Sequence, residues 1–80
     1  MDEHLVYVLE CGDGTLYTGY TTDLESRLAA HESGDGAKYT RGRGPFTVLH
    51  TESFDSRGDA LSREAAIKAL SRREKLALVE

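Results

Sequence analysis

The spacing of apolar and polar residues predicts a β-hairpin near the start of the chain. Residues 5–10 and 15–21 are rich in β-branched and aromatic side chains, which favour strands. The turn-forming cluster Cys11-Gly12-Asp13-Gly14 separates the two segments. We therefore expect two antiparallel strands joined by a short turn.

Two tyrosines define the register that we expect for this hairpin. Tyr7 and Tyr17 are ten residues apart, and side chains on a strand alternate between its faces with period two. The two rings face the same side only if the connecting loop is odd in length or contains a bulge. We expect the tyrosines side by side, with Gly19 leaving a gap beside them. The alternative is that they are two ordinary core aromatics.

The next segment predicts a helix from Thr22 to about Glu32. Thr22 and Glu25 have the spacing of a capping box, which makes Thr22 the expected N-cap. Ser33-Gly34 is a helix-ending signal. The helix therefore follows the hairpin directly.

This helix is expected to carry two polar side chains at the edge of its apolar stripe. At about 100° per residue, Leu24 and Leu28 define the inward face, and Arg27 and His31 fall beside or between them. Residues four apart on a helix are neighbours, so the two polar heads should lie together. The alternative is an arginine that reaches solvent and a histidine that caps the helix end.

Residues 34–45 predict a flexible basic loop. Small residues there allow close approach of a ligand, and the loop carries three cations and an aromatic ring, namely Lys38, Arg41, Arg43 and Tyr39. Cations bind phosphate, and an aromatic ring can stack on a base. A solvated loop without a ligand is the alternative.

The remainder of the chain predicts a third strand and two helices. Residues 46–53 have strand character. A helix is expected from about Asp59 to Leu70 with Ser56 as a cap, and a second capping box at Ser71 and Glu74 begins a short last helix with Leu76, Ala77 and Val79 on its apolar side. The predicted fold is α+β, a three-stranded antiparallel sheet flanked by three helices in the order β-β-α-β-α-α.

A carboxylate on the apolar face of the second helix is a candidate functional group. Ala60, Leu61, Ala65 and Ile67 are expected to span one arc, and Glu64 and Lys68 project from its middle. A carboxylate in an apolar setting is costly unless it is paired or binds a metal. An ion pair between Glu64 and Lys68 is the alternative to a metal site.

Composition limits the classes of protein that the chain can represent. Its 80 residues suit one domain, residues 1–80, and its one cysteine excludes an intramolecular disulfide. The acidic start does not resemble a signal peptide, and no apolar run reaches membrane-spanning length. We therefore expect a cytoplasmic protein without a membrane segment. The net charge of −4 argues against nucleic acid unless the cations gather on one surface.

Taken together, these residues resemble the GIY-YIG nuclease superfamily, in particular its small stand-alone members. Leu5-Val6-Tyr7 corresponds to the first motif and Tyr17-Thr18-Gly19 to the second. Arg27, His31 and Glu64 stand where the superfamily has its helix arginine, a frequent histidine and its metal-binding glutamate. The chain departs from the pattern at Leu5 and Val6, and it has no asparagine to match a late one in many relatives.

The resemblance implies a divalent-metal-dependent endonuclease that acts on DNA, with branched or damaged structures in repair or recombination as substrates. Glu64 would hold Mg²⁺ or Mn²⁺ against the scissile phosphate, and Arg27 would neutralise developing charge. A tyrosine would activate water. The expected residues are, for catalysis, Tyr7, Tyr17, Arg27, His31 and Glu64 and, for DNA binding, Lys38, Tyr39, Arg41, Arg43 and Lys68.

Two other functions compete with this interpretation. The first is a nucleic-acid-binding module without turnover. The second is a nuclease subunit that needs a protein partner or a second copy of the chain, because the chain is small and acidic and larger relatives supply DNA affinity through added domains. A buried glutamate favours the enzyme, since binding alone does not require one.

Overall fold

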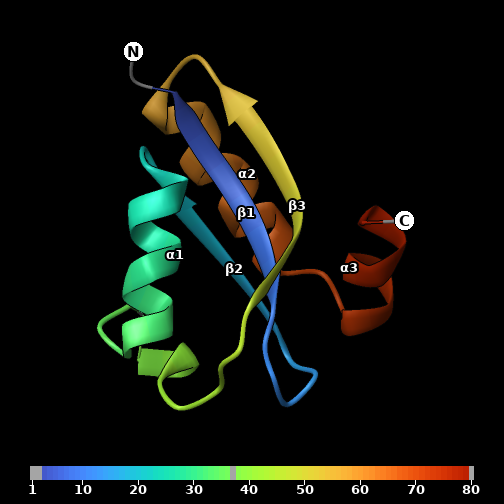
Figure 1. Ribbon diagram of the computed structural model, residues 1–80. Helices are drawn as coiled ribbons and strands as arrows, with labels where there is room; N and C mark the ends of the chain where they lie inside the picture. The colour runs from blue at the N-terminus through green and yellow to red at the C-terminus, as the bar shows by residue number, and fades with distance from the viewer. Residues whose placement is uncertain (1–2, 37, 80) are drawn as a thin grey trace.

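The computed structural model describes residues 3–36 and 38–79, so Ala37 within the predicted loop lies outside the described residues. The elements follow the predicted order β-β-α-β-α-α, with one short 3₁₀ turn, η1, added after the first helix (Figure 1). They are β1 (His4–Glu10), β2 (Leu16–Thr21), α1 (Leu24–Ser33), η1 (Lys38–Thr40), β3 (Thr47–Phe54), α2 (Arg57–Lys68) and α3 (Arg72–Leu78). The predicted fold class is confirmed.

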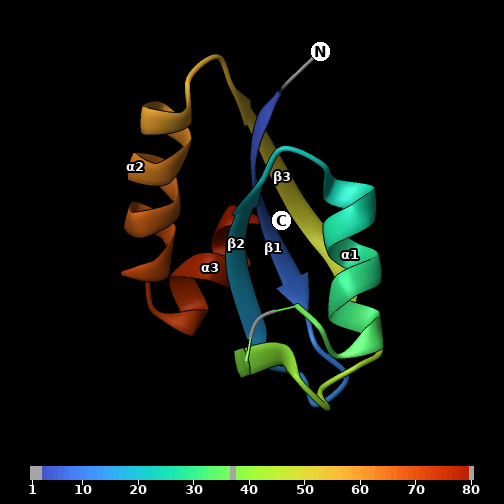
Figure 2. The same ribbon diagram turned by 90° about the vertical axis from the view of Figure 1, so that its left-hand side faces the viewer.

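The sheet is covered on both faces. Its strand order is β2-β1-β3, and both neighbours of β1 are antiparallel to it. Figure 2 shows α1 on one face and α2 with α3 on the other. Residues 6–9 of the central strand are fully buried, which explains why they form a continuous apolar run rather than an alternating one. β2 is an edge strand, and the candidate site lies along it.

The hairpin has the register that the tyrosine spacing predicts. Tyr7 pairs with Gly19, and Leu9 pairs with Tyr17. Five residues, 11–15, connect the last paired residues Glu10 and Leu16, so the loop is odd in length. Opposed residues share a face, and Tyr7 and Tyr17 therefore both point toward α1.

The N-cap predicted for α1 is wrong by one residue. Asp23 is the N-cap, and its side chain accepts a hydrogen bond from the backbone N–H of Ser26. Aspartate is a better N-cap than threonine, which accounts for the shift from Thr22. The predicted end is confirmed, because Gly34 caps the helix with a φ of 87°.

The apolar faces predicted for α2 and α3 are wrong in part. Ser56 caps α2 as predicted, but the helix begins at Arg57, and Leu61 and Ala65 are exposed. Ala60 and Ile67, seven residues apart, are the buried residues of α2, so its buried stripe is narrower than predicted. The second capping box, at Ser71 and Glu74, is confirmed.

On α3, Leu76 and Ala77 are exposed, whereas Leu78 and Val79 pack on the core. Val79 is therefore the correctly predicted part of that face. Within residues 3–36 and 38–79, no helix has the length and apolar character needed to cross a membrane.

Candidate active site

Tyr7 lies at the centre of the α1 face of the sheet. Its side chain is fully buried, and its ring crosses the backbone of Gly19 on the neighbouring strand β2. A Cβ atom at position 19 would overlap both the hydroxyl oxygen and the ring of Tyr7. The gap that we expected beside the tyrosines is therefore filled by Tyr7 itself, and only glycine permits this approach.

A chain of hydrogen bonds runs from α1 through Tyr7 to η1. The Arg27 Nε–H donates to the Tyr7 hydroxyl oxygen over 3.3 Å. The same hydroxyl lies 2.8 Å from Nε2 of His31, and the other ring nitrogen, Nδ1, lies 2.8 Å from the hydroxyl of Thr40. Tyr7 accepts from Arg27, so its own proton is directed at His31 Nε2. A neutral imidazole that accepts at Nε2 donates at Nδ1, and the proton order is then Tyr7 to His31 and His31 to Thr40.

Burial and charge hold both members of the central pair in their neutral forms. Burial raises the pKa of Tyr7 above its ordinary value, the hydrogen bond from Arg27 opposes that rise, and the charge of Glu64 adds to it. Burial is also the main cause that lowers the pKa of His31, with repulsion from Arg27 as the second cause. At neutral pH His31 is therefore an uncharged acceptor next to a protonated phenol.

Tyr17 lies beside this chain, at the border with solvent. Its ring centroid is 6.3 Å from that of Tyr7 and 5.2 Å from that of His31, which it meets edge-on. The tyrosines are thus side by side, as the sequence predicted. On its other side Tyr17 stacks on Tyr39 at 5.9 Å, so the ring that we expected to stack on a base lies against the site.

The cover over His31 was not predicted from the sequence. His31 is 1% exposed because Gly36 packs its backbone against the imidazole and Thr40 closes over it from η1. A polar residue at the inward edge of a helix implies that some partner exists. Nothing in the glycine-rich loop indicated that Thr40 would be that partner.

Glu64 approaches from the helix on the opposite face of the sheet. Its side chain is 17% exposed and forms an ion pair of 3.2 Å with Lys68, one helical turn away. The ion pair that is the alternative to a metal site is therefore present. The charge of Glu64 is the smallest of the influences on the pKa of Tyr7, which it raises, and within the described residues the contact that Glu64 makes is the ion pair with Lys68.

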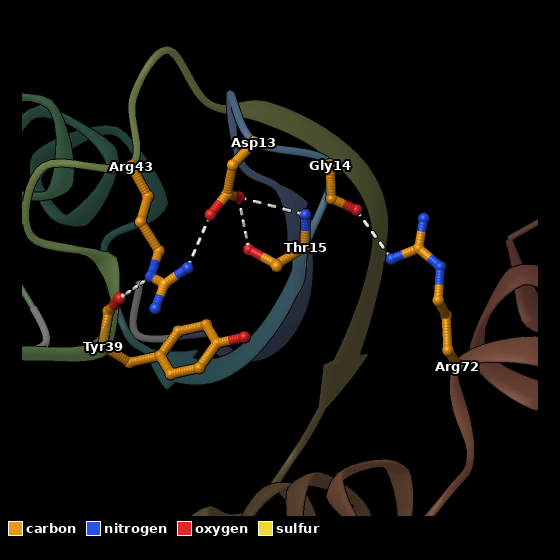
Figure 3. Close-up of polar contacts among 6 residues, drawn as sticks. All are labelled: Asp13, Gly14, Thr15, Tyr39, Arg43 and Arg72. Carbon is orange, nitrogen blue, oxygen red and sulfur yellow. Dashed lines mark hydrogen bonds and ion pairs between the residues drawn. The ribbon is translucent and has the colours of Figure 1, made fainter.

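Among the cations of the predicted basic loop, Arg43 is already engaged within the protein. Its guanidinium pairs with Asp13 in the hairpin turn, donates to the Tyr39 carbonyl oxygen and lies 4.6 Å above the centroid of the Tyr39 ring (Figure 3). Hydrogen bonds from Thr15, helped by Arg43, lower the pKa of Asp13 to about 2, so the pair is charged at neutral pH. Arg43 thus holds Tyr39 in place, whereas Lys38 and Arg41 are exposed.

A cavity of about 300 Å³ adjoins the outer edge of β2 beside the hydrogen-bonded chain. Three of the predicted site residues line it, Tyr17, Tyr39 and Lys68, together with Leu16, Thr18 and Lys75. The structure therefore brings only part of the predicted site to this concave surface, because Tyr7, Arg27, His31 and Glu64 are not among the residues that line it. Neither Lys38 nor Arg41 is among the residues that line this cavity.

Comparison with known proteins gives a consistent result. The family model described as the GIY-YIG catalytic domain matches residues 3–77. A UPF0213 protein of Halobacterium salinarum is 65% identical over 94% of this chain and 97% of its own length. A UPF0213 protein of Oceanobacillus iheyensis is 58% identical over 100% of this chain and 94% of its own length.

Two solved structures are similar over nearly the same extent. The solution NMR structure of a UPF0213 protein from Bacillus halodurans has a TM-score of 0.63 at 56% identity and covers 96% of this chain and 82% of that one. The solution NMR structure of a protein from E. faecalis has a TM-score of 0.64 at 49% identity, with 94% and 83% covered. Both the sequence and the fold are thus shared with small proteins of this kind.

Proposed function

The chain belongs to the GIY-YIG catalytic domain family, a nuclease family, and from that premise we propose that it is a divalent-metal-dependent endonuclease that hydrolyses DNA phosphodiester bonds. The observation that carries the proposal is the buried chain from Arg27 through Tyr7 and His31 to Thr40. A fold of this size gains more stability from an apolar core than from a polar network. Such a network, beside an open cavity and a nearby carboxylate, suits proton transfer.

The side chains at this edge fit a hydrated Mg²⁺ or Mn²⁺ ion. Within the described residues no group of three or more His, Cys, Asp or Glu could form an all-protein metal cage. Mg²⁺ does not need one, because it keeps several waters and binds through one or two carboxylates plus substrate phosphates. We assign Glu64 as the carboxylate that binds the ion. Lys68 would then give up its ion pair with Glu64 and pair with a phosphate oxygen instead. When bound, the ion would polarise the scissile phosphate and lower the pKa of water.

Tyr7 and His31 together provide a route for the proton of the attacking water. The raised pKa of Tyr7 makes a free phenolate unfavourable. A relay avoids that species: once opening of the site admits water to the buried Tyr7 oxygen, that oxygen takes the proton of water while its own proton passes to His31 Nε2. His31 is ready to accept it, since its lowered pKa keeps the ring neutral. The proton thus ends on His31.

Arg27 and Tyr17 have supporting roles in this proposal. The Arg27 guanidinium carries a fixed positive charge next to the Tyr7 oxygen, where it stabilises negative charge that develops on that oxygen and on the phosphate. Tyr17 packs on the imidazole of His31 and lines the cavity, which suits a role in placing the substrate. DNA repair or recombination at branched structures is the setting that we propose.

The direct experiment is incubation of the purified protein with labelled linear, nicked, flap and four-way DNA, with Mg²⁺, Mn²⁺ or EDTA. We expect cleavage that requires the metal and is strongest on branched substrates. A protein that binds DNA and cuts none of these substrates in either metal would instead be a binding module. Cleavage that appears only when cell extract is added would identify the partner-dependent subunit.

A further inference from the structure

A groove without carboxylates follows the outer edge of β2 away from the candidate active site. The 300 Å³ cavity beside Tyr17 continues into a second cavity of about 250 Å³, and Leu16, Tyr39 and Lys75 line both. Thr15 and Arg72 complete the lining of the second cavity. Figure 2 shows η1 and α3 on either side of this end of β2. The groove therefore runs from the edge of the site to the hairpin turn.

The charges that line the groove are all positive. Lys68, Lys75 and Arg72 contribute to it, and no aspartate or glutamate among the described residues does. The whole chain has 14 acidic residues against 10 basic ones, so a surface with cations alone departs from its overall composition. Such a local concentration of positive charge attracts a polyanion.

Lys75 differs from the other two cations. The Lys68 ammonium pairs with Glu64, and the Arg72 guanidinium donates to the carbonyl oxygen of Gly14 over 2.6 Å. Lys75 is partly buried at the junction of the two cavities, and its ammonium has no carboxylate partner within the described part of the chain. An ammonium in that position is available to an anionic ligand.

The walls of the groove are held in place by contacts that do not involve Lys75. On one side the pair of Arg43 and Asp13 fixes Tyr39 to the hairpin turn, and on the other Arg72 ties α3 to the same turn (Figure 3). The hairpin turn thus joins both walls. A preformed groove requires little ordering of the protein when a ligand binds.

We propose that this groove binds the DNA strand on one side of the scissile phosphate and that Lys75 contacts a flanking phosphate. The inference rests on the proposed nuclease function, because it takes the scissile phosphate to lie at the Tyr17 end of the groove. The ligand is a phosphodiester chain, and Tyr39 and Leu16 provide the apolar surface beside it. The groove is a strand-binding surface that lies outside the hydrogen-bonded chain.

The test compares Lys75→Ala with Arg73→Ala. Arg73 lies on the same helix, is exposed and lines neither cavity, so its replacement removes the same charge without touching the groove. Affinity for a fluorescent single-stranded oligonucleotide is measured in EDTA across a salt series, with melting curves for each variant. We expect Lys75→Ala to weaken binding about fivefold to tenfold and to reduce the log–log salt slope by ~0.7, the value for one single-strand phosphate contact. Lys75→Arg should restore the slope.

Equal weakening by Lys75→Ala and Arg73→Ala would overturn the proposal, because it would reflect net charge alone. If Lys75→Ala lowers the melting temperature, Lys75→Met takes its place in the comparison, because methionine keeps most of the length of the lysine side chain. Inorganic phosphate should displace the oligonucleotide no better than sulfate at equal ionic strength. Displacement by phosphate alone would make the groove a site for free phosphate and overturn the strand assignment.

Cleavage assays separate this proposal from the nuclease function. Under both proposals Lys75→Ala raises KM for DNA and leaves kcat near the wild-type value, because Lys75 does not touch the reacting groups. If Lys75→Ala weakens DNA binding in a protein that never cuts, the groove proposal stands and the nuclease function is overturned. If Lys75→Ala leaves DNA binding and KM unchanged in a protein that cuts DNA, the nuclease function stands and the groove proposal is overturned.

Discussion

The two faces of the sheet are packed with different chemistry. Between the sheet and α2 the core consists of apolar side chains, with Val6, Val8, Ala60 and Ile67 fully buried. Between the sheet and α1 the centre is occupied by Tyr7, and His31 and Thr40 are buried with it as a hydrogen-bonded set. Burying polar groups reduces stability unless all are paired. The comparison indicates that the α2 face is packed with apolar side chains, whereas the α1 face combines an apolar cluster with a buried hydrogen-bonded set that suits the proton transfer we propose.

The largest effect expected from this difference is on the α2 face. Ile67→Ala removes a fully buried side chain and should lower the free energy of unfolding by about 2–5 kcal/mol. Activity per folded molecule should not change. Leu61→Ala on the same helix is the control, because Leu61 is 36% exposed and its loss should change stability by about 0.5 kcal/mol or less. Denaturant titration measures both, and equal losses would mean that α2 packs on another face.

A smaller loss of stability, combined with a loss of activity, is expected on the α1 face. Gly19→Ala places a Cβ atom against the Tyr7 hydroxyl and should cost about 1–3 kcal/mol through overpacking. Because the phenol must move, its hydrogen bond to His31 should also be disturbed, and cleavage should fall. The matched control is Gly58→Ala, since a Cβ atom there meets nothing within 4 Å. If Gly19→Ala kept full stability and activity, the position of Tyr7 over β2 would be contradicted.

The smallest effect is a pH dependence of stability that His31 on the α1 face should add above the pH range in which Asp13, Glu52 and Glu74 take up protons. The pKa of His31 is lower in the folded chain than its ordinary value of 6.5, so the unfolded chain binds the proton more strongly. Stability should therefore fall as the pH is lowered below 6.5, with a slope of at most ~1.4 kcal/mol per pH unit for one proton. His31→Gln should remove this slope between pH 6.5 and 5. An identical slope in both proteins would assign the titration to another group.

The sequence predicted the parts of the site that depend on local periodicity. The ten-residue spacing of Tyr7 and Tyr17 puts both rings on one face only across an odd loop or a bulge, and the structure has the odd loop, residues 11–15. The four-residue spacing of Arg27 and His31 predicted that their heads lie together, and in the structure both contact the Tyr7 hydroxyl. These predictions succeeded because they depend only on the regular geometry of strands and helices.

Contacts made by loops and by weakly amphipathic helices were not predictable in the same way. Thr40 reaches His31 from an irregular segment whose path no periodic pattern defines. The inward position expected for Leu61 was wrong, because short alanine side chains give α2 little contrast between its faces. The internal partner of Arg43 was not predicted either, because Asp13 is thirty residues away, in the hairpin turn. Pairing between residues so far apart in the chain can be identified only when the fold is known.

Glu64 provides the most direct test of the proposed chemistry. In Glu64→Gln the amide keeps the shape of the side chain but not its charge, so Mg²⁺-dependent cleavage of branched DNA should fall by roughly 100-fold or more, by analogy with the loss of one electrostatic stabiliser. DNA binding and the melting temperature should stay close to wild type. A variant that cuts branched DNA at the wild-type rate would contradict the account, since loss of the half-exposed Lys68 ion pair costs only about 0.2–0.5 kcal/mol in either case.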